Sequence, residues 1–156
     1  MEVVLATKNL DKIEEIKEIL KDLGIKILTF KDFPDFPIVK EDKDTLEGNA
    51  LKKARAIARF TGKVALADDS GLEVEALGGA PGVFSSRFAG EDATYEDNNR
   101  KLLSLLKGIP LKKRRATFRC VIAISDPKGS EKIVEGVCRG KIIEENRGDN
   151  GFGYDP

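Results

Sequence analysis

The chain has 156 residues, of which 40% are hydrophobic and 35% are charged, with 27 basic and 27 acidic side chains. This length and composition suit one folded domain over residues 1–156 with its own core, and they exclude global disorder. A formal net charge of zero argues against broad nucleic-acid binding, and no apolar stretch is long enough to span a membrane.

Hydrophobic periodicity predicts alternating strands and helices in the first half of the chain. We expect a buried strand over 2–6, a helix over 10–23, a strand over 25–30, an irregular connection over 33–37 and a helix over 44–61. Asn9 is the expected N-cap of the first helix, and Gly24 and Gly62 are expected to end the two helices. Asp44 with Glu47 resembles a capping box for the second helix.

The second half of the chain adds further strands and one helix. We expect a short strand over 64–67 ending at Asp68-Asp69, a glycine-rich turn over 78–82, a helix over 94–107 and strands over 116–125 and 130–138. Asp126-Pro127-Lys128-Gly129 fits a type I turn between the last two strands. The basic run over 112–115 is interpreted as a solvated approach to a strand, and the tail over 147–156 as irregular. The residues therefore predict an α/β or α+β sheet flanked by helices.

Residue types limit the chemistry that this chain can perform. Histidine is absent, which excludes Ser-His-Asp and Cys-His nucleophiles and histidine-rich metal sites. Cys120 and Cys138 are the only cysteines, and we interpret them as core thiols of a protein in a reducing compartment. Because the N-terminus has no secretory signal, we expect a cytoplasmic location. Carboxylate, lysine, hydroxyl and metal–water chemistry remain available.

The segment Thr7-Lys8-Asn9-Leu10-Asp11-Lys12 joins a predicted strand to a predicted helix. Free backbone N–H groups and the positive end of the helix dipole favour anions at such a junction. Thr7 and Asn9 add hydrogen-bond donors, and Lys12 adds a positive charge. The same pattern also fits an ordinary junction in which Asn9 only caps the helix.

Acidic residues stand at two predicted element boundaries, Glu41 before a helix and Asp68-Asp69 after a strand. Such carboxylates are hard oxygen ligands that can hold Mg²⁺ together with substrate phosphates. Ser70 and Gly71 would let the backbone turn close to a ligand. Solvated acidic loops are the alternative, and for Glu41 alone that alternative is favoured.

Two further patterns are weaker. Asn49 and Lys53 share one helix face, so Lys53 could reach a phosphate, although a solvent-facing lysine is favoured by the spacing alone. In Gly151-Phe152-Gly153-Tyr154-Asp155, two aromatic rings and an acid could stack on a nucleobase and bind its edge. A glycine-rich loop with buried rings explains the same residues.

Together these motifs resemble the inosine/xanthosine triphosphate pyrophosphatase family over essentially the whole chain. The segments that carry the resemblance, in order, are Thr7-x-Asn9-x-x-Lys12-x-x-Glu15, Glu41, Glu47-x-Asn49-Ala50-x-x-Lys53, Ala67-Asp68-Asp69-Ser70-Gly71-Leu72, Leu77-Gly78-Gly79-Ala80-Pro81-Gly82-Val83 and Gly151-Phe152-Gly153-Tyr154-Asp155-Pro156. The resemblance implies an elongated mixed sheet flanked by helices, in two lobes with a cleft between them. It also implies a homodimer that uses Mg²⁺ to convert ITP, dITP and XTP to the monophosphate and pyrophosphate.

The resemblance assigns a role to each motif residue. The triphosphate would be held by Thr7, Lys8, Asn9, Lys12 and Lys53, and Ser70 would contact the nucleotide. Glu41 and Asp69 would hold the metal, and Phe152, Gly153, Tyr154 and Asp155 would line the base pocket. Asp69 is the residue usually named as proton acceptor for the attacking water, and Asp68 is the alternative.

One departure from the family pattern concerns the C-terminal side. The family continues past Gly-Phe-Gly-Tyr-Asp-Pro with a strand, a lysine, a Ser-His-Arg motif that reads the 6-oxo purine, and a helix. We therefore expect weakened or absent catalysis and looser base selectivity in this chain. A nucleotide-binding protein without turnover and a pyrimidine-directed pyrophosphatase of the related Maf-like group are the alternatives. The Asp-Asp-Ser-Gly and Gly-Gly-Ala-Pro-Gly motifs favour the purine group.

Overall fold

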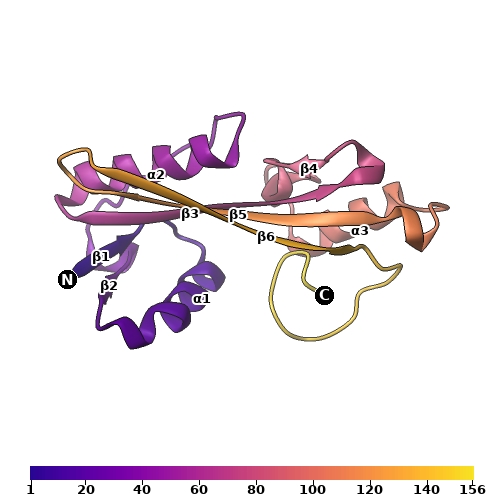
Figure 1. Ribbon diagram of the computed structural model, residues 1–156, viewed down its shortest axis with the longest axis horizontal. Helices are drawn as coiled ribbons and strands as arrows, with labels where there is room; N and C mark the ends of the chain where they lie inside the picture. Colours follow the sequence, from indigo (N-terminus) through magenta and orange to yellow (C-terminus); the bar gives the residue numbers. More distant parts are fainter. The chain divides into compact units, whose positions relative to one another are not determined.

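The computed structural model describes all residues from Met1 to Pro156 (Figure 1). Three α-helices and six strands form its framework, and short 3₁₀ turns connect several of them. In chain order they are β1 (Glu2–Leu5), α1 (Leu10–Leu20), β2 (Lys26–Leu28), α2 (Leu46–Thr61), β3 (Val64–Val74), β4 (Pro81–Gly82), α3 (Tyr95–Leu105), β5 (Arg115–Ser125) and β6 (Glu131–Lys141).

All six strands belong to one mixed sheet. The strand order is β2-β1-β3-β5-β6, and β4 pairs with β3 beside this path. Strand β1 is parallel to β2 and to β3, with Val3 opposite Val64 and Leu5 opposite Leu66. Strand β4 is antiparallel to β3, with Leu72 opposite Gly82. The predicted mixed sheet flanked by helices is confirmed.

The chain divides into two compact units. Unit 1 comprises Met1–Asp69 and Val121–Glu135, and unit 2 comprises Ser70–Cys120 and Gly136–Pro156. Each unit has a hydrophobic cluster of its own. In unit 1 the buried members are Val3, Leu5, Ile13 and Leu66, and in unit 2 they are Leu72, Val74, Leu102, Leu106 and Ala116.

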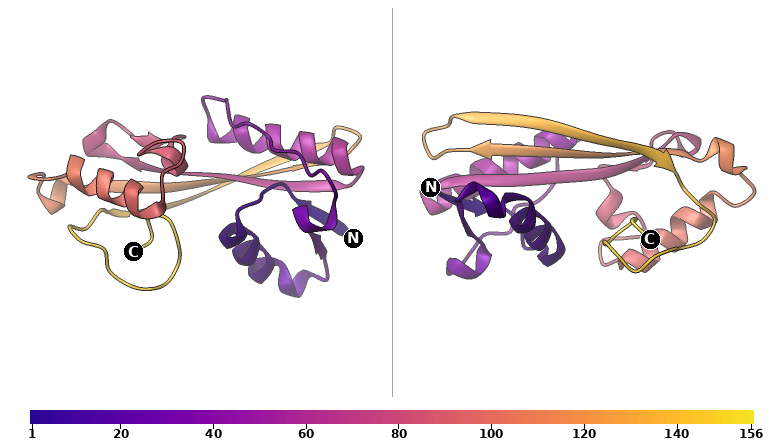
Figure 2. Two further views of the ribbon diagram at one scale, coloured as in Figure 1. Left: turned by 180° about the vertical axis from the view of Figure 1, so that it is seen from behind. Right: turned by 60° about the horizontal axis from the view of Figure 1, so that its bottom comes forward.

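Within unit 1, helices α1 and α2 lie on opposite sides of β3 (Figures 1 and 2). Helix α1 begins as predicted, with the Asn9 side chain accepting a hydrogen bond from the Lys12 backbone N–H. Gly24 and Gly62 end the helical segments with φ values of 62° and 67°, which a residue with a Cβ rarely adopts.

The predicted N-cap of α2 is wrong by one residue. Thr45, not Asp44, has the extended backbone of an N-cap, and its hydroxyl accepts a hydrogen bond from the Gly48 backbone N–H at 3.0 Å. Leu46 is buried as the first helical residue. The position at which this side chain enters the core therefore fixes the start of the helix.

Strand β3 is longer than predicted. It continues through Asp68, Asp69, Ser70 and Gly71 to Val74, so these four residues lie inside the strand and not in a turn after it. Acidic residues normally end a buried strand because burying a charge is costly. Here each carboxylate pairs with a lysine, and the strand can continue.

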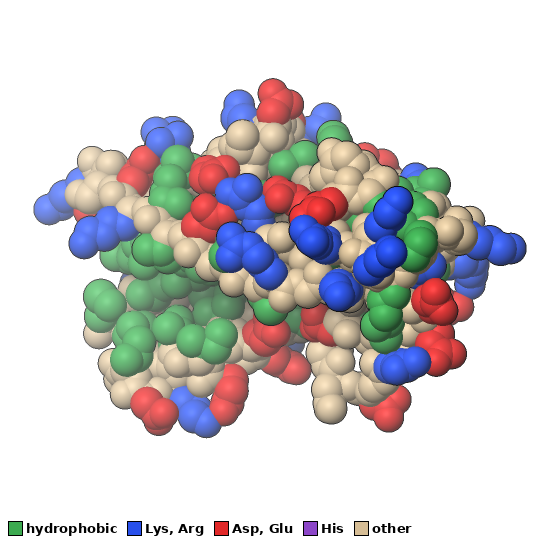
Figure 3. All heavy atoms as spheres, turned by 45° about the vertical axis from the view of Figure 1, so that its right-hand side comes forward, with side chains coloured by type: hydrophobic (Ala, Val, Ile, Leu, Met, Phe, Trp, Pro, Cys, Tyr) green, Lys and Arg blue, Asp and Glu red, His purple; other side chains and the backbone are tan.

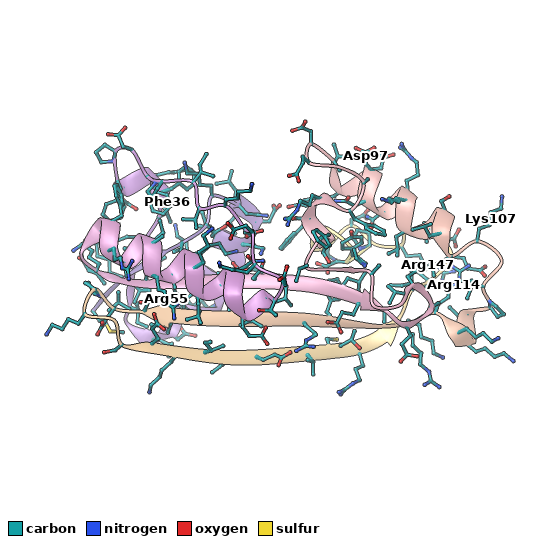
Figure 4. All side chains as sticks on the ribbon, turned by 90° about the horizontal axis from the view of Figure 1, so that it is seen from above. Phe36, Arg55, Asp97, Lys107, Arg114 and Arg147 are labelled. Carbon is teal, nitrogen blue, oxygen red and sulfur yellow. The ribbon has the colours of Figure 1, made fainter.

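The hairpin of β5 and β6 is built as the turn residues predict. Gly129 N–H donates to the Asp126 carbonyl at 3.1 Å, and the Asp126 side chain accepts hydrogen bonds from Lys128 and Ser130. In unit 1 the Arg55 guanidinium makes two hydrogen bonds to Glu131, at 2.5 and 2.7 Å, which tie α2 to the start of β6 (Figure 4). This paired geometry suits arginine and not lysine.

Surface charges of the two signs are mixed. On the face in Figure 3, basic and acidic side chains lie interspersed, in keeping with their equal numbers in the sequence. None of the helices combines the length and the apolar character that a membrane crossing requires. Cys120 and Cys138 form no disulfide bond, but Cys138 is exposed and is therefore not the core thiol that we predicted.

Arg114 departs most clearly from the sequence prediction. We predicted a solvated basic run, yet Arg114 is only 5% exposed (Figure 4). Its guanidinium donates to the carbonyl oxygens of Leu106, Ile109 and Ile143, at 3.0, 2.8 and 3.3 Å. It therefore provides hydrogen-bond donors for carbonyl groups at the carboxyl end of α3 and joins this end to the segment after β6.

We expect Arg114→Met to lower the free energy of unfolding by about 2–4 kcal/mol, because buried carbonyl groups would lose charged donors. Denaturation by urea, followed by circular dichroism, would measure the change. Arg115→Met is the matched control, since Arg115 is exposed and its loss should change stability by no more than about 0.5 kcal/mol. Equal effects of the two substitutions would contradict the role given to Arg114.

Candidate active site

Five charged side chains from four segments of unit 1 meet beside strand β3. We call this group the acid–lysine cluster; its members are Lys12, Glu41, Lys53, Asp68 and Asp69. The predicted convergence of separate carboxylates and lysines is thus present in the structure. The group contains three acids and two lysines, and such a concentration of buried charge needs close pairing to be tolerated.

Lys12 reaches the cluster from the first turn of α1. Its Nζ lies 2.5 Å from Asp68 Oδ2, and the Asp68 side chain is only 6% exposed. Burial lowers the pKa of Lys12, but attraction to Asp68, and less strongly to Asp69 and Glu41, raises it by more. The net pKa lies above the ordinary lysine value, and the amine stays charged.

Lys53 reaches the cluster from the buried face of α2. Its Nζ lies 2.5 Å from Glu41 Oε1 and 3.6 Å from Asp69 Oδ1. The Lys53 side chain is 9% exposed and that of Asp69 is 8% exposed. The structure therefore overturns the solvent-facing position that spacing alone favours for this lysine, and it brings Glu41 to the same amine.

The alternation of side chains along a strand explains the pairing. Successive residues of a β-strand point to opposite faces. Asp68 accordingly meets Lys12 from α1, and Asp69 meets Lys53 from α2, on the other side of β3. Two adjacent acids in one strand can thus receive one lysine from each helix.

The surroundings of Asp69 are unfavourable for a negative charge. Burial is the main cause that raises the pKa of this carboxyl group, the nearby Glu41 adds to it, and Lys53 opposes it. Its Oδ2 atom is buried and has no hydrogen-bond partner. A buried carboxylate oxygen without a donor is costly, and it points to a ligand or to catalysis.

The implied Mg²⁺ ion can be tested against these residues. No group of three or more acidic or cysteine side chains is arranged to hold a metal by itself. Mg²⁺ is commonly held by only one or two carboxylates, with water and phosphate oxygens completing its shell. Glu41 and Asp69 supply two carboxylates around one cation, the Lys53 ammonium, so the donor set fits such an ion.

The remaining residues of the first motif form a local cap. Thr7 Oγ1 accepts a hydrogen bond from Asn9 N–H at 3.1 Å, and Asn9 caps α1 through Lys12 N–H. Lys8 Nζ lies 5.9 Å from the ring centre of Phe36, which packs with Phe33 and Phe60. The sequence analysis missed this aromatic cluster, although three phenylalanines in that region were a usable signal.

Asn49 fixes the segment that carries Glu41. It is almost fully buried on α2, accepts a hydrogen bond from Lys43 N–H at 2.9 Å and donates to the Lys43 carbonyl at 3.4 Å. An interaction with Asn49 also lowers the pKa of Asp69, although it does not outweigh burial. The Asn49 side chain thus holds the loop that follows Glu41 and also interacts with the acid–lysine cluster.

The tail motif lies in unit 2. Tyr154 packs against the core of that unit, and its hydroxyl donates to the Ser85 carbonyl at 2.8 Å. Phe152 contacts Tyr95, with 5.9 Å between ring centres, while Phe152 N–H donates to Asp155 and Asn99 donates to the Gly153 carbonyl. Ser70 also belongs to unit 2, at its first residue.

Comparison with models of protein families shows the family of this chain. The model of the Ham1 family matches residues 3–156. The chain belongs to the Ham1 family. This confirms the resemblance drawn from its motifs.

Curated Ham1 relatives include two bacterial proteins named dITP/XTP pyrophosphatase. The one from Desulforamulus reducens is 55% identical over 156 residues, which are 100% of this chain and 78% of that relative. The one from Geobacter sulfurreducens is 52% identical over 154 residues, or 99% of this chain and 77% of that relative.

Solved structures give the same family. A HAM1 protein from Coxiella burnetii has a TM-score of 0.88 and 46% identity, covering 100% of this chain and 80% of that one. A nucleoside-triphosphatase/dITP/XTP pyrophosphatase from Mycobacterium abscessus has a TM-score of 0.82 and 39% identity, covering 100% and 82%.

The raised pKa of Asp69 predicts a pH-dependent stability. The folded protein holds this proton more tightly than the unfolded chain, so the carboxyl group favours folding at low pH, and this contribution is lost as pH rises from 3.8 through the raised pKa. Asp69→Asn should therefore be more stable than the unmodified protein at neutral pH in metal-free buffer. The difference should shrink as the pH falls toward 3.8.

Thermal unfolding over a pH series would measure this difference. Asp42→Asn is the control of opposite sign, because a hydrogen bond from Lys52 lowers the pKa of the exposed Asp42. That variant should gain no stability at neutral pH. An Asp69→Asn protein less stable than the unmodified chain at neutral pH would contradict the prediction.

Proposed function

We propose that this chain hydrolyses the bond between the α and β phosphates of dITP, ITP and XTP, releasing the nucleoside monophosphate and pyrophosphate. Membership of the Ham1 family and the names of the relatives support the reaction and its purine substrates. The acid–lysine cluster is the observation that carries the proposal. It supplies the cationic and carboxylate groups that phosphoanhydride hydrolysis requires, without any histidine or cysteine nucleophile.

Charge neutralisation is the main task in this reaction. The triphosphate carries several negative charges, and the departing pyrophosphate gains more in the transition state. Lys12 and Lys53 would provide fixed positive charges to the phosphates. Backbone N–H groups at the start of α1, between Thr7 and Lys12, would bind a phosphate oxygen.

Glu41 and Asp69 would hold Mg²⁺. When bound, the ion would neutralise phosphate charge and act as a Lewis acid on a phosphoryl oxygen. Two carboxylates suffice because the nucleotide would provide further oxygen ligands.

Asp69 is proposed as the proton acceptor for the attacking water. Oδ2 of Asp69 is buried and engaged by no donor, so this oxygen is open to a proton from water. Asp68 is less suited to this role because Lys12 pairs with it at 2.5 Å, whereas Lys53 lies 3.6 Å from Asp69. Asp68 would then act by holding Lys12 in place.

Several further predictions from the sequence concern contacts with the nucleotide, the oligomeric state and the location of the protein. Contacts of Lys8 and Ser70 with the nucleotide, and of Phe152, Gly153, Tyr154 and Asp155 with its base, remain predictions. The hydroxyl of Tyr154 is engaged by the Ser85 carbonyl, and its ring packs against the core of unit 2. The homodimer and the cytoplasmic location also remain predictions.

Pyrophosphate release tests the proposed reaction. We expect release from dITP, ITP and XTP with Mg²⁺, and loss of turnover by about 10²–10⁴-fold in Asp69→Asn, because a general base contributes that much. The stability of Asp69→Asn serves as the folding control. Near-normal turnover in this variant, or no release of pyrophosphate from dITP by the unmodified protein, would contradict the proposal.

A second measurement tests the metal role of Glu41. Glu41→Gln should raise the Mg²⁺ concentration needed for half-maximal activity, by about tenfold or more, because a charged oxygen ligand becomes a neutral one. Asp42→Asn is the matched control, since Asp42 is the adjacent acid and pairs with Lys52 outside the cluster. The control should need the same Mg²⁺ concentration as the unmodified protein. A similar shift in both variants would indicate a general charge effect.

A further inference from the structure

Lys53 occupies the place in the cluster where a cation is needed. Its ammonium group contacts Glu41 Oε1 at 2.5 Å and Asp69 Oδ1 at 3.6 Å, and the Lys53 and Asp69 side chains are both more than nine-tenths buried. These two acids are the ones proposed to hold the metal. One lysine amine therefore contacts both proposed metal ligands at once.

The charge of the whole group explains why an internal cation is required. Three carboxylates and two lysines give a formal charge of −1 in a poorly hydrated place. Without the amine of Lys53 the formal charge would be −2, and the second oxygen of Asp69 is already buried without a hydrogen-bond donor. Such a concentration of negative charge strongly attracts a cation.

We propose that the Lys53 ammonium is the resident counter-ion of Glu41 and Asp69, and that a divalent cation displaces it from these carboxylates and frees it for a nucleotide phosphate. This inference rests on the proposed metal role of the two acids. Metal binding and the release of Lys53 are then one coupled event. The chain thus presents its phosphate-binding lysine only once the metal is in place.

The local structure permits this exchange. The backbone of Lys53 is fixed, because its neighbours Ala50, Ala54 and Ile57 bury the same face of α2. The four-carbon side chain can nevertheless turn its amine without moving the helix. The metal must compete with the amine for the same oxygens, so the lysine lowers the affinity for metal when no nucleotide is present.

Removal of this amine gives the decisive test. Lys53→Met keeps the length of the side chain and removes its charge. In the absence of nucleotide, we expect this variant to bind Mg²⁺ at least about tenfold more tightly than the unmodified protein, because the competing charge is gone. We also expect a lower melting temperature in chelator and a larger rise in that temperature when Mg²⁺ is added.

Lys52→Met is the matched control. Lys52 is adjacent on α2, but its amine binds Asp42 and the Lys40 carbonyl outside the cluster. Its Mg²⁺ dissociation constant, measured by calorimetry, should equal that of the unmodified protein. Equal or weaker Mg²⁺ binding by Lys53→Met would overturn the inference.

A measurement on the unmodified protein covers the case in which Lys53→Met does not fold. In nuclear magnetic resonance of isotope-labelled lysine ammonium groups, Mg²⁺ should shift the signal of Lys53 and leave that of Lys52 in place. Lys53→Arg would assign the signal by its disappearance. A Lys53 signal that stays unchanged while Mg²⁺ binds would overturn the inference.

The proposed function and the counter-ion inference can be contradicted separately. Pyrophosphate release from dITP tests that function, whereas Mg²⁺ affinity without nucleotide tests the counter-ion. If the protein releases pyrophosphate but its Lys53→Met variant gains no Mg²⁺ affinity, the counter-ion inference would be overturned and the proposed function would stand. If neither the unmodified protein nor Lys53→Met binds Mg²⁺, both the counter-ion inference and the proposed metal role of Glu41 and Asp69 would be overturned.

Discussion

The pairing of three carboxylates with two lysines, of which Asp68, Asp69 and Lys53 are buried, is the interaction on which this protein depends. Charges of one sign cannot be buried together, and each acid of the cluster is therefore within ion-pair distance of an amine. Replacement of these groups by apolar residues would cost the fold little and could stabilise it. Their presence is explained by chemistry on a polyanionic substrate, in which the same amines and carboxylates are required.

Strand β3 makes this arrangement possible. Its two adjacent aspartates point to opposite faces, so that α1 and α2 can each supply one lysine from its own side of the strand. The parallel pairing of β1 with β3 brings the start of α1 beside the aspartates, since the end of β1 lies next to Leu66. Helix α2 adds Asn49, which holds the loop leading from Glu41.

Unit 2 depends on a different kind of polar contact. Arg114 joins the end of α3 to the segment after β6, and Tyr154 joins the tail to the Ser85 carbonyl. Both side chains pair with backbone carbonyl groups, and Arg114 also lies 3.8 Å from the Glu144 carboxylate. Polar groups in unit 2 thus fasten irregular segments to a core, while those of the cluster in unit 1 are arranged for ionic chemistry.

Hydrophobic periodicity is a local property, and from it the sequence by itself determined the mixed sheet with its helices. The motifs in their order determined the family, and the resemblance to that family named the members of the cluster. The sequence also predicted the caps at Asn9 and Gly62 and the turn at Asp126. Only the tertiary structure decided that β3 continues through its aspartates, that Lys53 is buried and that Arg114 lies inside. Burial of a charge depends on a partner distant in the chain, and no local pattern records where that partner will lie.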